Sequence, residues 1–164
     1  MKRTSTIFLQ AVIMLTGIAV LAIMIRFPLI EGRAENLDLF HIYFDPFILY
    51  VYAASIAFFV ALYKAFRLLG YIGKNKAFSQ NSVNALRSIK HYATLLTILI
   101  VLAGIYIRIF HNKDDDPAGF LAVCMVAGFA CIVVAVVSSV LEKIFQNGMD
   151  IKTENEQLHE LLKK

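Results

Sequence analysis

The sequence predicts an all-α integral membrane protein, a four-helix bundle with both termini in the cytoplasm. Three observations predict it: the composition is apolar, the apolar residues are gathered in four long runs, and cations are concentrated between the second and third runs. The 164-residue chain is 59% hydrophobic and 17% charged, with a mean hydropathy of +0.69, whereas soluble domains average roughly 45–50% apolar and about 25% charged residues. We therefore expect a single membrane domain, residues 1–164, whose main partner is the lipid bilayer.

The first two apolar runs, at residues 7–27 and 47–66, are each long enough to cross a membrane. About 20 helical residues match a hydrocarbon core of about 30 Å. No small-x-small cleavage site follows the first run, so we expect an uncleaved helix. It is predicted to stop near Pro28, because proline disfavours helical geometry in the residue before it. Asp45 and Pro46 predict the start of the second helix, as cap and first helical residue.

The third and fourth runs, at residues 92–109 and 118–141, complete an even number of crossings. Asp116 and Pro117 repeat the cap-and-proline pattern in front of the fourth run. Gly148 predicts the end of the fourth helix, because glycine is common where helices stop.

The distribution of Lys and Arg residues predicts how the chain is oriented in the membrane. The acid-free basic loop at residues 64–91 holds six of them: Lys64, Arg67, Lys74, Lys76, Arg87 and Lys90. Cytoplasmic connections carry an excess of Lys and Arg, so we place this loop inside, with the N-terminus and the tail at 142–164. Twelve Lys and Arg residues then lie inside, and four lie on the side of the outer loops at 28–46 and 110–117.

The six cations of the basic loop are also the candidate contact residues. They suit lipid headgroups, at on the order of 1 kcal/mol each before screening, or a cytosolic protein partner. Direct contact with nucleic acid is not predicted, because the cations lie beside apolar runs. Ser79 or Asn81 predicts the cap of a helix that continues into the third run, with Val83, Leu86 and Ile89 on neighbouring faces.

Two stripes of small residues predict where helices pack closely, since small side chains let lipid-embedded backbones approach each other. The stripe on the second run repeats every four residues and consists of Ala53, Ala57 and Ala61. The stripe on the fourth run has the same spacing and consists of Ala127, Cys131, Ala135 and Ser139.

The sequence contains no constellation typical of catalysis, a metal or a cofactor. Cys124 and Cys131 are two helical turns apart on one helix, beyond the reach of a disulfide. The histidines are scattered, at positions 41, 91, 111 and 159. The aspartates at 114–116 invite a cation, but calcium loops space their ligands at alternate positions. We interpret that acidic stretch as an outer loop, and we expect no cofactor.

The last part of the tail, residues 149–164, is polar and predicted to be partly helical, with Leu158, Leu161 and Leu162 on one side. Three arrangements fit it. It lies on the membrane, docks its acidic residues on the basic loop, or pairs with a second copy of the chain in a homo-oligomer.

Residues 71–93, YIGKNKAFSQNSVNALRSIKHYA, form the most specific motif. With GIAVLA at 17–22 and the residues leaving the second run, Ala61 to Phe66 and Leu69, this motif resembles a family of small four-span bacterial membrane proteins of unknown function. Such proteins are often encoded beside a Cro/CI-type helix-turn-helix regulator. The resemblance implies the bacterial inner membrane. The tail departs from that family, which closes in Asp-Leu-Thr-Ile, because Gln157, Leu158 and His159 follow Glu156 here.

Three classes of function are compatible with these features. The first is a regulatory or sensory membrane component acting through a cytosolic partner, such as a small helix-turn-helix regulator. The second is a small transport, channel or self-protection (immunity-like) protein, although solute pathways usually place ionisable residues deep in the membrane and the middles of the runs have none. The third is an intramembrane enzyme, which needs acid or base groups near its nucleophile. No histidine or carboxylate lies at the depth of the hydroxyl residues in the runs, which are Ser55, Thr94, Thr97, Ser138 and Ser139. We expect a protein that is not an enzyme.

Overall fold

The computed structural model describes residues 3–163 apart from 31–45, 75 and 111–117. The described residues form no strand, and their four long helices are α1 (Arg3–Ile30), α3 (Pro46–Gly73), α4 (Gln80–Phe110) and α5 (Ala118–Leu161). Each helix is long and apolar enough to cross a membrane. The predicted all-α, four-span composition is therefore confirmed.

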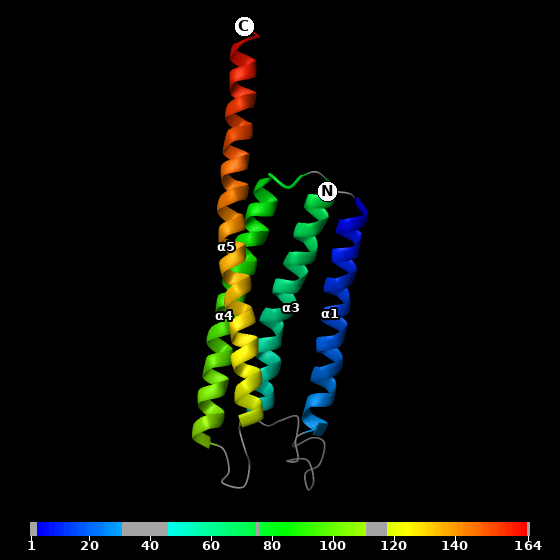
Figure 1. Ribbon diagram of the computed structural model, residues 1–164, viewed down its shortest axis with the longest axis vertical. Coiled ribbons are helices and arrows are strands. Elements are labelled where there is room, and N and C mark those ends of the chain that lie inside the picture. The colour runs from blue at the N-terminus through cyan, green and yellow to red at the C-terminus, as the bar shows by residue number, and fades with distance from the viewer. Residues whose placement is uncertain (1–2, 31–45, 75, 111–117, 164) are drawn as a thin grey trace.

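Successive helices run in opposite directions, so three parts of the chain meet at one end of the molecule (Figure 1). These are the start of α1, the connection between α3 and α4, and the C-terminal part of α5. We call this the linker end, and residues 74–79 the linker.

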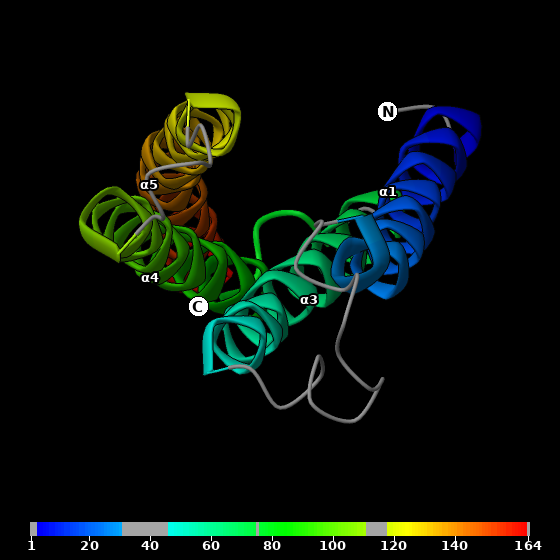
Figure 2. The same cartoon turned by 90° about the horizontal axis from the view of Figure 1, so that it is seen from below.

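The bundle is open. Each helix packs on its neighbour in the chain, α1 on α3, α3 on α4 and α4 on α5. Seen along the helices, the four lie in an arc with α1 and α5 at its two ends (Figure 2). Apolar side chains face outward from this arc, among them Val126 and Phe129 at 72% and 70% exposure. Such surface suits lipid and is unlike that of a soluble domain.

The tightest packing lies at the linker end, where α3, α4 and α5 meet. Its buried cluster is Leu68, Ala85, Leu86 and Ile89, covered by Ala65, Ile72, Leu141 and Phe145. Val83 is also fully buried. Val83, Leu86 and Ile89, which were predicted to lie on neighbouring faces of one helix, are thus buried at this end.

The basic loop is mostly helical. α3 continues seven residues past the predicted end of the second run, and α4 is one continuous helix from Gln80 into the third run. The amide of Lys76 donates to the carbonyl of Tyr71 at 2.9 Å, which satisfies an end carbonyl of α3. Ser79 directly precedes α4, the position predicted for a cap, and its carbonyl accepts from the Ser82 amide at 2.9 Å.

Pro28 does not end the first helix, because α1 continues to Ile30. Proline has no amide proton, so the carbonyl of Met24, four residues earlier, loses its helical donor. The hydroxyl of Tyr52 on α3 donates to that carbonyl at 3.3 Å. The neighbouring helix thus satisfies the freed carbonyl, and α1 ends two residues beyond Pro28, close to the predicted stop.

Gly148 does not end the fourth helix either. α5 has 44 residues, roughly 66 Å at 1.5 Å per residue, and passes through Gly148 without a break. A Cβ atom at Gly148 would lie 2.5 Å from the ring of Phe78, and the same ring packs edge-on against Phe145 with centroids 5.6 Å apart. Glycine at this position lets the linker approach α5 closely.

The predicted packing stripes lie only partly at helix contacts. Ala57 is buried and Ala61 half-buried, whereas Ala53 is exposed. The four α5 residues, Ala127, Cys131, Ala135 and Ser139, are all half-buried. The most buried positions of α5 are neighbouring ones: Gly128, Ser138 and Glu142. Their spacing of ten and four residues follows the alternating three- and four-residue steps of a helix seam.

Several predictions concern residues outside the described part of the chain. These are the caps at Asp45 and Asp116, most of the two outer loops, and the aspartates at 114–116.

Gly148→Ala tests the contact between linker and α5. Alanine favours a helix by about 1 kcal/mol over glycine, but overpacking against Phe78 costs about 1–3 kcal/mol. We expect thermal unfolding in detergent to show no gain or a loss of stability. Gly119→Ala is the matched control, since no atom lies within 4 Å of its new Cβ, and should be neutral or stabilising. Equal gains in both variants would contradict the packing role of Gly148.

Candidate functional site at the linker end

The structure places the six predicted contact cations in three settings at the linker end. Arg87 and Lys90 pair with a buried carboxylate. Lys64 and Arg67 line a polar cavity, and Lys74 and Lys76 are exposed on the linker.

Glu142 is the carboxylate that joins α4 to α5. It is 8% exposed, and within the described ranges it is the one charged residue that is buried. Arg87 Nε lies 2.8 Å from its Oε1, and Lys90 Nζ lies 2.7 Å from its Oε2. Glu142 follows the apolar run 118–141, where the helix leaves the predicted membrane core. The hydrogen bonds from Lys90 and then Arg87 lower the pKa of the Glu142 carboxyl, against the opposing effect of burial.

Sequence reasoning did not identify this contact. The signal was present, because Glu142 follows the fourth run by one residue and Lys90 precedes the third run by two. In antiparallel neighbours these positions lie at the same depth. Arg87 and Lys90 therefore contribute less to an outward basic surface than predicted, although the Arg87 side chain is still 50% exposed.

A polar cavity of about 130 Å³ lies between α3 and α4. Its polar lining consists of Lys64, Arg67 and Tyr71 from α3 and Asn81, Asn84 and Ser88 from α4. Arg67 Nη2 donates to the Tyr71 hydroxyl at 2.6 Å, and its guanidinium lies 5.9 Å from the Tyr63 ring centre. None of the ion pairs found among the described residues involves Lys64 or Arg67. The cavity therefore carries net positive charge and suits an anion.

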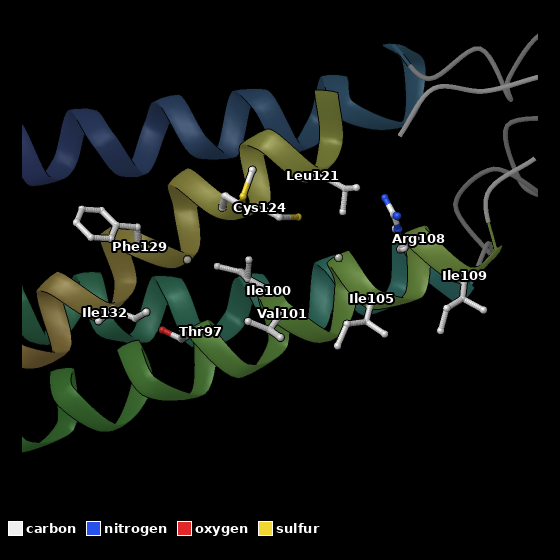
Figure 3. Close-up of a pocket in the computed structure, with 13 residues that line it drawn as sticks. Thr97, Ile100, Val101, Ile105, Arg108, Ile109, Leu121, Cys124, Phe129 and Ile132 are labelled. Carbon is white, nitrogen blue, oxygen red and sulfur yellow. The ribbon is translucent and has the colours of Figure 1, made fainter. Parts of the chain in front are cut away.

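A larger cavity of about 610 Å³ lies between α4 and α5, toward the end opposite the linker. Figure 3 shows its apolar side chains, such as Ile100 and Leu121, with Arg108 near one end and Thr97 toward the other. The lining residues include no carboxylate and no imidazole. This cavity offers volume for hydrocarbon, and its lining supplies no acid–base pair.

The C-terminal part of α5 extends well beyond the other helices (Figure 1). Every residue from 151 to 163 is exposed. The described residues of 149–164 therefore do not dock on the basic loop, which was one of the three arrangements left open for them. Ile151 and Leu158, at 59% and 51% exposure, are seven residues apart and so lie on one face of the helix. We call residues 149–161 the α5 extension.

Two of the hydroxyl groups weighed as catalytic candidates bond to backbone carbonyls of their own helices. Ser55 Oγ donates to the carbonyl of Tyr52 at 2.6 Å, and Thr97 Oγ1 donates to that of Ala93 at 3.0 Å. Across the residues with described positions, no three His, Cys, Asp or Glu side chains are placed to hold one metal ion.

Glu142→Gln tests the ion pairs that join α4 to α5. Loss of the negative charge leaves Lys90 and Arg87 without an ionic partner, and we expect the free energy of unfolding to fall by about 1–2 kcal/mol. Equilibrium unfolding in detergent measures it. Glu156→Gln is the matched control, because its pair with Lys152 is highly exposed and 3.8 Å long, so its loss should change stability by at most about 0.5 kcal/mol. Equal effects would mean that the buried pair is worth no more than the exposed one.

Comparison with known proteins places the chain in a family. Residues 9–157 match the model of a family described as protein of unknown function, DUF2975. The chain is 40% identical over 159 residues to the uncharacterized membrane protein YoaS of Bacillus subtilis (strain 168), covering 95% of this chain and 98% of that protein. No solved structure matches the chain significantly. The chain therefore belongs to the DUF2975 family, and its similarity to a membrane protein together with its four apolar helices makes it a multi-pass membrane protein.

Proposed function

We propose that this protein is a non-enzymatic regulatory or sensory component of the bacterial inner membrane, which acts by holding a cytosolic protein at the membrane surface. One observation carries the proposal: α5 continues past the other helices as an exposed helix with apolar residues on its surface. A helix about 13 residues long is marginal by itself in water. Here it is the continuation of a longer helix, which supplies the nucleus.

The base of the α5 extension is fixed by contacts with other elements. Glu142 is paired with α4, and Phe78 of the linker packs on Phe145 beside Gly148. These contacts favour a rigid helix, and a rigid helix loses little conformational entropy when it binds. The exposed Ile151 and Leu158 suit a partner with an apolar groove, as in other helix-in-groove complexes.

The partner we propose is a small helix-turn-helix regulator of the Cro/CI type. The resemblance in residues 71–93 supports this choice, since proteins of that kind are often encoded beside such regulators. The regulator supplies the contact with DNA, so this chain needs none. Lys74 and Lys76, exposed on the linker near the base of the α5 extension, add positive charge to the same surface.

The proposed function requires the linker end to face the cytoplasm, with both termini inside. The excess of Lys and Arg supports this orientation. In a background with Cys124 and Cys131 replaced by Ala, we expect Lys74→Cys to react with a membrane-impermeant maleimide only after the cells are permeabilised. Phe110→Cys, at the opposite end of α4, is the matched control and should react in intact cells. The reverse pattern would exclude a cytosolic partner at this surface.

Photo-crosslinking in cells tests the partner. A photoreactive residue in place of Gln157 should yield an adduct with a soluble helix-turn-helix protein, identified by mass spectrometry. Ile151→Glu with Leu158→Glu removes the apolar face, so we expect at least a tenfold loss of adduct. Lys152→Glu with His159→Glu changes the adjacent positions and should keep the adduct within about twofold.

Two outcomes of the crosslinking would overturn the proposal. An adduct of two copies of this chain would mean that the α5 extension forms a homo-oligomer. Equal losses in the two double variants would mean that the apolar face does not bind the partner.

A further inference from the structure

We infer that the polar cavity between α3 and α4 binds the phosphate of an anionic membrane phospholipid. This site is separate from the α5 extension and does not depend on the proposed partner. Its volume of about 130 Å³ is below the roughly 300–1,000 Å³ of sites that enclose drug-sized ligands. It therefore fits a single small anionic group.

The chemistry of the lining matches a phosphate. Lys64 and Arg67 supply two positive charges and several N–H donors, and Asn81, Asn84 and Ser88 offer polar side chains from the facing helix. Charge-assisted hydrogen bonds to phosphate are about twice as strong as neutral ones. The side-chain amide oxygen of Asn84 already accepts from Gln80 at 3.2 Å, which directs its NH₂ group to other partners.

The position of the cavity favours a lipid as the source of the phosphate. Lys64 and Arg67 lie where the apolar run 47–66 ends, so they lie at the predicted depth of the headgroup layer. On the membrane side of Arg67, one helical face of α3 carries Tyr63 and Ile56, at 57% and 65% exposure. Leu95 is seven residues from Ser88 on α4 and is also exposed, at 44%. These exposed apolar surfaces suit the acyl chains of a lipid whose phosphate occupies the cavity.

The other cations of the basic loop lack this arrangement. Arg87 and Lys90 bond to Glu142, so a carboxylate lies beside them. Lys74 and Lys76 are exposed, and neither lines the cavity. Of the six cations of the basic loop, we therefore assign the phosphate to Lys64 and Arg67.

Lipid binding to the full chain in detergent tests the inference. The probe is phosphatidylglycerol, with phosphatidylcholine as the zwitterionic comparison, and the readout is the dissociation constant from a fluorescent lipid analogue or from native mass spectrometry. Lys64→Gln with Arg67→Gln should weaken phosphatidylglycerol binding about tenfold or more. Lys74→Gln with Lys76→Gln removes the same charge outside the cavity and should stay within about twofold of wild type.

A second variant separates binding from folding. Asn84→Leu keeps both cations but removes an amide from the lining, and it should weaken phosphatidylglycerol binding while the melting temperature stays close to that of wild type. Equal affinity in all variants, or equal losses in the two lysine-containing double variants, would overturn the site. Displacement of phosphatidylglycerol by millimolar inorganic phosphate would overturn the lipid as its ligand, because the cavity would then recognise free phosphate.

Discussion

The ion pairs of Glu142 with Arg87 and Lys90 determine how α4 is turned at the linker end. Because Arg87 and Lys90 must face α5, the residues about a quarter turn away, Asn84 and Ser88, face α3 and line the polar cavity. The apolar residues on the opposite side of α4, Leu86 and Ile89, form the core. One buried carboxylate thus fixes the rotation of a 31-residue helix. A carboxylate so enclosed is favourable only because both of its oxygens are hydrogen-bonded to cations.

The remainder of the bundle follows from lipid as the solvent. Between lipid-embedded helices there is no hydrophobic drive to close a bundle, so close packing and polar contacts decide which helices meet. α1 is held to α3 by such contacts: Gly17 lies against Leu62, and the Tyr52 hydroxyl bonds to Met24. The arc of helices in Figure 2 is built from such contacts between neighbours in the chain. It leaves the α4–α5 cavity of about 610 Å³ open to hydrocarbon.

The number, type and alternation of the helices could be predicted from the sequence, because run length and composition alone determine them. The bond from Ser55 to a carbonyl within its own helix follows from local rules in the same way. Local rules assign proline and glycine to helix ends, but α1 passes Pro28 and α5 passes Gly148 because of residues distant in the sequence. Tyr52 donates to the carbonyl that Pro28 leaves without a helical donor, and Phe78 packs in the space beside Gly148. The pairing of Glu142 with Lys90 and Arg87 was missed for the same reason, because these partners lie 52 and 55 positions earlier in the chain.

The contact of Glu142 with α4 also determines how far a tilt of α5 would displace a protein bound to the α5 extension. From Glu142 to Leu161 the helix rises about 28 Å, so a change of about 10° in the tilt of α5 against α4 moves its end by about 5 Å. The contacts at the linker end that resist such a tilt include the two ion pairs of Glu142, the packing of Phe78 on Phe145, and the cover that Leu141 and Phe145 give to the buried cluster. They lie at the predicted membrane surface, where a lipid in the α3–α4 cavity would contact α4 through Asn84 and Ser88. A lipid at α4 and a protein on the α5 extension would therefore act on one helix pair from its two sides.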